Sequence, residues 1–202
     1  MGIEVIKKMK KSGLKIVIVN GAPGSGKTTF EYFIKKKMAS FCEMRSTIDL
    51  VKEIALFYAG WDGKKDLRSR KFLSDLKDLL SSYNNIPFND IVRYKDIWED
   101  ELAQYGVLEQ SHVLLVDSRE PQEIKRFKEE LGAVTLLIRR ADAEAQETSN
   151  HADANVLNFD YDWVIENNGS LEDLEKKTND FLDLLFEENW SIINIENEKD
   201  DV

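Results

Sequence analysis

The chain has 202 residues, of which 42% are hydrophobic and 33% are charged, and its formal net charge is −10. This composition is typical of one globular domain, and the acidic balance argues against broad nucleic-acid binding, which needs a basic face. Cys42 is the single cysteine and no apolar run reaches about 18 residues, so neither an internal disulfide nor a membrane span is expected. We therefore expect a cytoplasmic protein, a monomer or homodimer, that binds neither nucleic acid nor membrane.

Predicted strands and helices alternate along the chain. Apolar, largely β-branched runs predict buried parallel strands at 14–20, about 41–44, 112–117, 134–138 and 161–165. Apolar residues three or four positions apart predict helices at 27–38, 47–59, 67–83, 90–105, 121–131 and from 170 onward. This alternation is typical of a three-layer α/β fold, in which helices cover both faces of a parallel five-stranded sheet.

Several residues suit the ends of the predicted helices. Pro121 falls in a first helical turn, where its missing N–H costs little, and Gly132 suits the end of the same helix. Ser170 and Asp173 have the spacing of a capping box at the start of the last helix. The helix at 67–83 has the most regular apolar spacing, formed by Phe72, Leu73, Leu76, Leu79, Leu80 and Tyr83.

The turn after the first strand fits the P-loop pattern G-x-x-x-x-G-K-[ST], as Gly21-Ala-Pro-Gly-Ser-Gly-Lys27-Thr28. It lies between a strand and a helix, where backbone N–H groups and the positive helix end can hold a phosphate. In this pattern Lys27 reaches the β- and γ-phosphates and the Thr28 hydroxyl holds Mg²⁺, so ATP and Mg²⁺ are the expected cofactors. The alternative is a glycine-rich turn without a ligand. The expected nucleotide-binding residues here are Gly21, Gly24, Ser25, Gly26, Lys27, Thr28 and Thr29.

An acidic residue ends the next buried strand. In P-loop proteins Asp117 would occupy the place of the acid that polarises the metal shell, so Thr28 and Asp117 are the predicted metal site. The alternative is a surface acid that caps the following helix. Ser118 stands where an ATPase motor usually has a glutamate, and no guanine-binding Asn-Lys-x-Asp is present. Both features favour transfer to a small acceptor over hydrolysis.

Arginines follow two of the predicted strands. Arg119 comes two residues after Asp117, and Arg139 and Arg140 follow the strand at 134–138. Strand ends in such sheets face the ligand crevice, and arginine suits forked phosphate contacts, although each could equally be a surface ion-pair residue. We predict that Arg139 binds the nucleotide. The predicted catalytic residues are Lys27, Asp117, Arg119 and Arg140.

One stretch of this acidic chain is basic. Five cations and two acids lie between Trp61 and Lys71, which favours either a local anion site or a solvated helix face. The predicted acceptor-binding residues are Trp61, Lys65, Arg68 and Arg70. Aromatic and amide side chains nearby can also supply the walls of a nucleobase pocket; they are Trp61, Tyr83, Asn84, Asn85 and Phe88.

No linker or repeat divides the chain, so we expect one P-loop domain over 1–202. Within it, the stretch at about 139–157 lacks a clear period and is expected to form a lid over the site. The end of the chain, about 187–202, is expected to be a solvated acidic tail.

Two segments resemble phage-type deoxynucleoside monophosphate kinases and animal phosphomevalonate kinases. Asp117-Ser-Arg119-Glu-Pro-Gln-Glu-Ile124 is similar to their Asp-x-Arg-x-x-x-Glu-Ile segment. The stretch 159–174, Phe-Asp-Tyr-Asp-Trp-Val-Ile-Glu-Asn-Asn-Gly-Ser-Leu-Glu-Asp-Leu, resembles the C-terminal segment of both. The resemblance implies a doubly wound kinase fold and transfer of the γ-phosphoryl group of ATP to a phosphate acceptor.

The resemblance also implies roles for particular residues. Lys27 and Thr28 would serve ATP and Mg²⁺, and Asp117 and Arg119 would lie at the reaction centre. The residues implied at the acceptor and at the adenine are Arg68 and Arg70, and Asn167 and Gly169, respectively. The chain departs from these kinases in its P-loop ending, Lys-Thr-Thr in place of Gly-Lys-Asp, and in the His-Ala-Asp-Ala of the lid, where they carry a His-x-Ser-Glu-like element.

Three functions follow as hypotheses. The leading one is ATP-dependent phosphorylation of a nucleoside or deoxynucleoside monophosphate to the diphosphate. The second is phosphorylation of a non-nucleotide phosphate such as phosphomevalonate, which would need fewer aromatic side chains around the acceptor. The third is a regulator that binds the nucleotide and turns nothing over.

Overall fold

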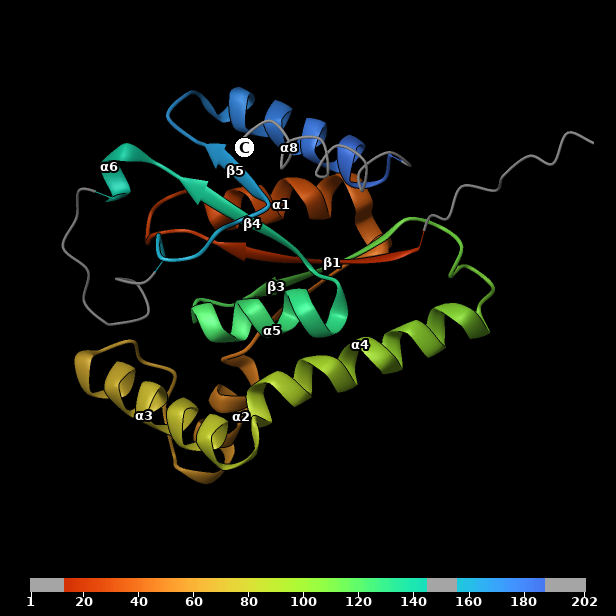
Figure 1. The fold of residues 1–202 in the computed structure, drawn as a ribbon. Helices are drawn as coiled ribbons and strands as arrows, with labels where there is room; N and C mark the ends of the chain where they lie inside the picture. The colour runs from red at the N-terminus through yellow and green to blue at the C-terminus, as the bar shows by residue number, and fades with distance from the viewer. Residues whose placement is uncertain (1–12, 145–155, 188–202) are drawn as a thin grey trace, which may run out of the picture.

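The computed structural model describes residues 13–144 and 156–187, and a five-stranded sheet lies at its centre (Figure 1). Its strands are β1 Leu14–Asn20, β2 Cys42–Ser46, β3 His112–Asp117, β4 Val134–Arg139 and β5 Trp163–Glu166. They lie in the order β2-β3-β1-β4-β5, and each neighbouring pair is parallel. The five predicted strands and the parallel sheet are therefore confirmed.

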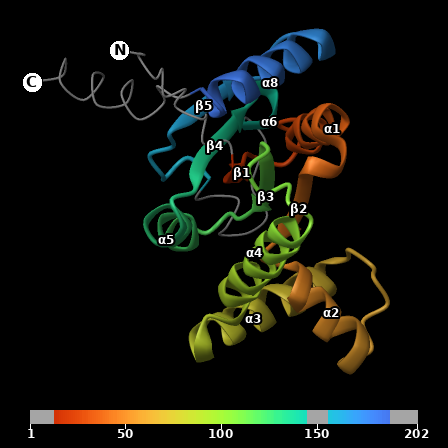
Figure 2. The same cartoon turned by 90° about the vertical axis from the view of Figure 1, so that its right-hand side faces the viewer.

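The helices that cover the sheet are α1 Lys27–Met38, α4 Ile86–Gln104, α5 Pro121–Leu131 and α8 Leu171–Leu185. Side chains of a strand alternate between its two faces, so β1 contributes to two separate cores. Val17 and Val19 pack in the core that includes residues of α1 and α8, whereas Ile16 and Ile18 pack in the core that includes α4 and α5. Figure 2 shows these helix pairs on opposite faces of the sheet. The predicted three-layer α/β fold is confirmed.

Local sequence signals explain where two of these helices begin and end. Helix α5 starts at Pro121 and stops at Gly132, whose φ of 63° is left-handed. In α8 the Asp173 N–H donates to Ser170 Oγ over 3.2 Å, and the Ser170 N–H donates to Asp173 Oδ2 over 2.8 Å. The predicted capping box is therefore present.

A helical insertion joins β2 to β3. It consists of α2 Asp49–Tyr58, α3 Leu67–Asn84 and α4, and in both views α2 and α3 lie on the side of the sheet away from α8 (Figures 1 and 2). Helix α3 is present as predicted, yet none of its residues is buried, and Leu79 and Tyr83 are 63% and 81% exposed. The regularly spaced apolar side chains of α3 are therefore not buried against the sheet.

Helix α4 begins earlier than the predicted 90–105. Asn85 adopts a left-handed φ of 50° directly after α3 and turns the chain, so α4 starts at Ile86. Pro87 then lies in the first turn of α4 and is buried. Pro87 was expected to break off the helix at 67–83, and it instead lies in the first turn of the next helix.

The predicted lid and tail lie largely outside the described residues. Of the lid, the structure describes the short helix α6 Ala141–Glu144, the end of β4 and residues 156 and 157, and of the tail it describes residue 187 alone. None of the described helices is both long and apolar enough to cross a membrane.

Candidate functional site

The carboxyl ends of β1 and β3 form a switch point in the sheet. The chain leaves β1 through α1 toward β2 at one edge, and it leaves β3 through α5 toward β4 on the other side. Open α/β sheets bind their ligands at such a point, where neighbouring connections run in opposite directions. The P-loop follows β1 here, and Asp117 ends β3 in register with Val19.

The P-loop has a shape that requires glycine at two positions. A side chain at Gly21 would approach Ile138 O and Ser25 Oγ to 2.5 Å, and one at Gly26, where φ is 102°, would overlap the side-chain amide of Asn167. Gly26 is the N-cap residue of α1, and no side chain among the described residues caps the start of this helix. The Thr29 and Phe30 N–H groups donate to Gly26 O, so among the described residues the N–H groups of Lys27 and Thr28 remain for an anion, which the helix dipole also favours.

Lys27 and Asp117 form an ion pair at this point, with Lys27 Nζ and Asp117 Oδ1 3.1 Å apart and the two side chains 11% and 35% exposed. Thr28 is exposed directly beside Lys27. No group of three or more potential His, Cys, Asp or Glu ligands occurs among the described residues. Mg²⁺ often takes one or two protein ligands and completes its shell with phosphate oxygens and water, so Thr28 and Asp117 fit such a site.

The hydroxyl of Ser25 supports the same interpretation. It is buried inside the P-loop, and its oxygen has no hydrogen-bond partner among the described residues. A buried hydroxyl without a partner is unfavourable, so it normally has a role or a missing ligand. A phosphate in the loop would provide that partner, and the residues present therefore fit a phosphate group.

Glu31 is a second carboxyl at the Lys27–Asp117 pair, and the sequence interpretation missed it. It lies on α1 one turn after Lys27 and is 7% exposed. Its pKa is raised from 4.5 to about 7, chiefly by burial and also by the nearby Asp117, and Lys27 partly offsets both effects. The signal in the sequence was its spacing of four residues from Lys27, which places both on one face of a helix.

Asn20 also went unrecognised in the sequence. This fully buried residue ends β1, where its Oδ1 accepts the Gly21 N–H over 2.8 Å and its amide donates to the Tyr161 hydroxyl over 2.7 Å. The Tyr161 hydroxyl in turn donates to Val156 O over 2.8 Å, and burial raises the Tyr161 pKa to about 12. A polar residue that closes an apolar strand was the available signal. Asn20 therefore fixes the start of the P-loop through its hydrogen bonds to Gly21 and Tyr161.

Asn167 lies against the P-loop rather than apart from it. Its side-chain amide donates to Ser25 O over 2.8 Å, across 142 residues of sequence, and its own N–H donates to Arg139 O over 2.7 Å. Gly169 follows in the turn before α8, where a side chain would approach Asp173 Oδ2 to 2.5 Å. The structure thus brings Asn167 against the P-loop, while its contact with adenine stays a prediction.

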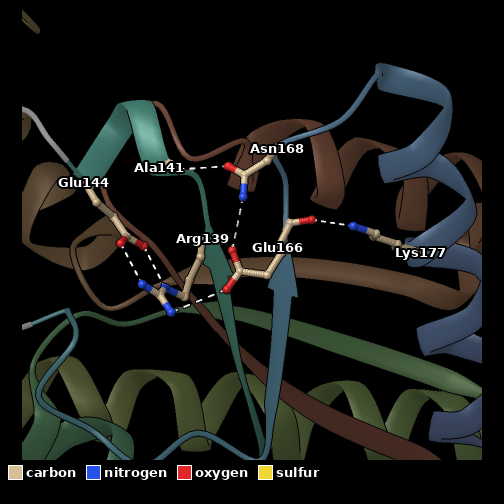
Figure 3. Close-up of polar contacts among 6 residues, drawn as sticks. All are labelled: Arg139, Ala141, Glu144, Glu166, Asn168 and Lys177. Atoms are coloured by element: carbon tan, nitrogen blue, oxygen red, sulfur yellow. Dashed lines mark hydrogen bonds and ion pairs between the residues drawn. The ribbon is translucent and has the colours of Figure 1, made fainter.

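Arg139 ends β4 and is held between the carboxylates of Glu144 in α6 and Glu166 at the end of β5 (Figure 3). Its guanidinium donates twice to Glu144, over 2.8 Å each, and its Nη1 lies 3.4 Å from Glu166 Oε1. The hydrogen bonds to Glu144 are the main cause of a raised Arg139 pKa. Arg140 is exposed. The predicted contact of Arg139 with the nucleotide would therefore require exchange of Glu144 for a phosphate.

Further hydrogen bonds connect the segments around Arg139 and Glu166. Asn168 Oδ1 accepts the Ala141 N–H over 2.9 Å, and Lys177 of α8 donates to Glu166 O (Figure 3). These contacts tie α6, the end of β5 and α8 together on either side of Asn167. The ends of β4 and β5 beside the P-loop are thus stabilised by contacts between segments that are distant in sequence.

The predicted acceptor-binding residues lie in the turn between α2 and α3 and at the start of α3; we call 61–71 the basic segment. Trp61 Nε1 donates to Lys64 O over 3.0 Å, and Arg70 Nε donates to Lys65 O over 3.0 Å. Lys65, Arg68 and Arg70 are exposed. Among the described residues no hydrogen bond or ion pair joins this segment to the P-loop. The structure therefore does not connect the predicted acceptor residues directly with Lys27 and Asp117.

Comparison with known proteins finds likeness in structure alone. Neither a protein-family model nor a curated protein matches the chain. The solved structures that resemble it include the APS kinase CysC of Mycobacterium tuberculosis in complex with AMPPNP and APS, at 12% identity over 85% of this chain and 99% of that chain, with a TM-score of 0.40.

Two further solved structures show a similar degree of likeness. A sugar kinase from Janibacter sp. HTCC2649 is 16% identical over 84% of this chain and 95% of that chain, with a TM-score of 0.43. A protein from Thermus thermophilus is 18% identical over 85% and 97%, with a TM-score of 0.46. The fold class rests on the strand order and P-loop of this chain itself, and these neighbours do not identify its substrate.

Proposed function

We propose that this chain transfers the γ-phosphoryl group of ATP to a nucleoside or deoxynucleoside monophosphate, giving the diphosphate. The observation that carries the proposal is the Lys27–Asp117 pair, 3.1 Å apart at the switch point of the sheet and beside the uncapped start of α1. A cation, a strand-end acid and free helical N–H groups are the parts that phosphoryl transfer requires for positioning and charge stabilisation.

The roles of the residues follow from charge and position. The P-loop N–H groups and Ser25 hold the phosphates, and Lys27 leaves Asp117 to neutralise the β- and γ-phosphates. Thr28 and Asp117 would hold Mg²⁺, which would neutralise charge on the transferred group. Arg119, two residues beyond Asp117, stabilises the transferring phosphoryl group.

The acceptor is proposed to lie between the strand ends and the basic segment. A monophosphate is already ionised near neutral pH, so its oxygen attacks without a general base. Arg68, Arg70 and Arg140 supply positive charge for it, and Trp61 supplies an aromatic surface for the base. This assignment agrees with the resemblance to deoxynucleoside monophosphate kinases noted in the sequence.

The second candidate acceptor is a non-nucleotide phosphate such as phosphomevalonate. The segment 117–124 resembles those kinases as well, and this resemblance is the observation that keeps the candidate open. The two acceptors differ in their need for a base-binding surface. A Trp61→Ala variant should weaken the binding of a nucleotide acceptor and leave the binding of phosphomevalonate unchanged.

The test is a coupled assay of ADP release with ATP and Mg²⁺ against a panel of ribonucleoside monophosphates, deoxynucleoside monophosphates and phosphomevalonate. Release that depends on one nucleotide acceptor, and that Lys27→Ala abolishes, would support the proposal and name the acceptor. Release with phosphomevalonate alone would select the second candidate. Silence across the panel, with ATP binding measured separately, would favour a nucleotide-binding regulator.

A further inference from the structure

A shielded ion pair joins the helical insertion to the rest of the protein. Lys77 of α3 donates to Glu123 Oε2 of α5 over 2.8 Å, and the two side chains are 15% and 14% exposed. By contrast, Lys71 and Asp75, which pair within α3, are 76% and 60% exposed. Surface pairs of the second kind contribute little, whereas a shielded pair fixes the two groups in one geometry.

The same carboxylate oxygen reaches the strand-end loop. Ser118 Oγ donates to Glu123 Oε2 over 2.9 Å, and Ser118 is 1% exposed. Ser118 is the residue between Asp117 and Arg119. Glu123 therefore accepts one hydrogen bond from α3 and one from the loop that carries the proposed metal ligand and arginine; we call this set the Lys77–Glu123–Ser118 bridge.

Apart from this bridge, helix α3 contacts α2 and α4 of the same insertion. None of its residues is buried, so packing of its own side chains holds it weakly. Its first turn carries Arg68 and Arg70 of the basic segment, and Lys77 lies on the same helix two to three turns later. Because a helix is stiff over this length, the position of Lys77 determines where Arg68 and Arg70 lie.

We propose that Lys77 is a positioning residue for the acceptor: through Glu123 and Ser118 it sets the distance from the basic segment to Asp117 and Arg119. The inference rests on the proposed phosphoryl transfer and adds the residues that align its two halves. A shielded pair is a weak source of stability, because desolvation offsets much of the attraction. Its effect is therefore expected in geometry, where a displacement of about 1 Å can cost about 100-fold in rate.

The kinetic test compares Lys77→Met with Lys125→Met. Lys125 forms an exposed pair with Glu129 on α5, 3.7 Å apart, and so controls for loss of a lysine charge near Glu123. Lys77→Met should lower kcat/KM for the acceptor by about 10- to 100-fold and leave the affinity for an ATP analogue within about twofold. Lys125→Met should change neither by more than about twofold. An equal loss of ATP affinity, or an equal effect of Lys125→Met, would overturn the inference.

Two further variants separate positioning from stability. Lys77→Arg keeps a cation for Glu123 and should retain most of the acceptor kinetics. Lys77→Met/Glu123→Leu removes both charges, so the fold should survive as judged by Tm, while Ser118 still loses its partner. Acceptor kinetics that stay low in this folded variant support the bridge, and full recovery would show that Lys77 acts through stability alone.

A measurement that does not need enzymatic turnover tests the inference independently of the proposed function. Hydrogen exchange of α3 amides should be at least about threefold faster in Lys77→Met than in wild type or Lys125→Met. If wild type transfers phosphate to no acceptor, the proposed function fails and this exchange experiment alone decides whether the bridge holds α3. Unchanged exchange in α3 would overturn the inference.

Discussion

The proposed nucleotide half and the proposed acceptor half of the candidate site are built in different ways. On the nucleotide side, Asn167 joins the P-loop to the end of β5, and Arg139 is held by two carboxylates. On the acceptor side, α3 buries no residue, and Tyr58 and Tyr83 are 85% and 81% exposed. A phosphate would thus meet a loop whose shape is already set, whereas the acceptor would have to gain contacts with exposed helices.

This difference suggests how binding energy is used at each half. A preformed cradle binds its ligand without a large ordering cost. An exposed helix pair that closes on a ligand would spend part of the binding energy on that movement, and would exclude water as it closes. We therefore expect substitutions in the nucleotide half to affect ATP affinity and stability, and substitutions in the acceptor half to affect acceptor kinetics alone.

The largest effect is expected from Lys27→Ala. Loss of the cation removes its contacts with the phosphates, so ATP affinity should fall by at least about 100-fold and turnover should vanish. Isothermal titration with a non-hydrolysable ATP analogue would measure the affinity. Lys36→Ala, which removes an exposed lysine of the same helix, is the matched control and should bind like wild type. A loss below about tenfold would mean that the P-loop does not hold the phosphates in this way.

A somewhat smaller effect is expected from Gly26→Ala. The new methyl group would overlap the Asn167 amide, and φ of 102° is unfavourable for alanine, so the free energy of unfolding should fall by about 3 kcal/mol. Chemical denaturation would measure the change. At Gly24, where φ is 83° but the nearest atom lies 3.9 Å away, alanine should cost about 1 kcal/mol. Equal costs at the two positions would show that the Asn167 contact does not constrain the loop.

Glu31 provides a test by pH. Its pKa is raised from 4.5 to about 7, so between these values the folded protein binds more protons than the unfolded chain. The free energy of unfolding should therefore fall as pH rises through this window, and Glu31→Gln should remove that slope. Well above pH 7 the variant should be more stable than wild type by about 3 kcal/mol, and below pH 4.5 the difference should disappear.

Denaturation in metal-free buffer at pH 5, 6, 7 and 8 would follow this difference, with the exposed Glu53→Gln of α2 as the control. A constant difference between wild type and Glu31→Gln across this range would contradict the raised pKa. A difference that grows with pH would show that, without a ligand, ionised Glu31 is an unfavourable buried charge in the proposed nucleotide half.

The smallest effect is expected from Arg68→Ala/Arg70→Ala. Both residues are exposed, so stability should change by less than about 0.5 kcal/mol. Acceptor KM should rise by about tenfold through the loss of phosphate contacts, while ATP affinity stays within about twofold. Steady-state kinetics with each substrate varied in turn would separate the two. A similar loss of ATP affinity would contradict the expectation that the two halves act on different substrates.

The parts of this molecule that depend on local chemistry were predictable from the sequence. Ser170 and Asp173 form the expected capping box, Gly132 ends α5, and the P-loop lies between β1 and α1. Each of these depends on residues within a few positions of one another. The alternation of strands and helices was sufficient to predict the layered sheet.

Features that depend on distant segments were not predictable in this way. The apolar spacing of α3 indicates a helix but does not say that the sheet lies elsewhere. The ion pairs of Arg139 could not be foreseen, because its partners Glu144 and Glu166 come from the separate segments α6 and β5; its contact with the nucleotide stays a prediction. Glu31 and Glu123 acquire their roles only when the fold brings Asp117 and Lys77 beside them.

The most direct test of the central claim is transfer of label from [γ-³²P]ATP, followed by chromatographic separation of the products with wild type and Lys27→Ala. The account predicts that wild type moves the label onto a nucleoside monophosphate, giving a labelled diphosphate, and that Lys27→Ala gives none. Label that appears only as inorganic phosphate, at the same rate with and without an acceptor, would show a hydrolase and contradict the account.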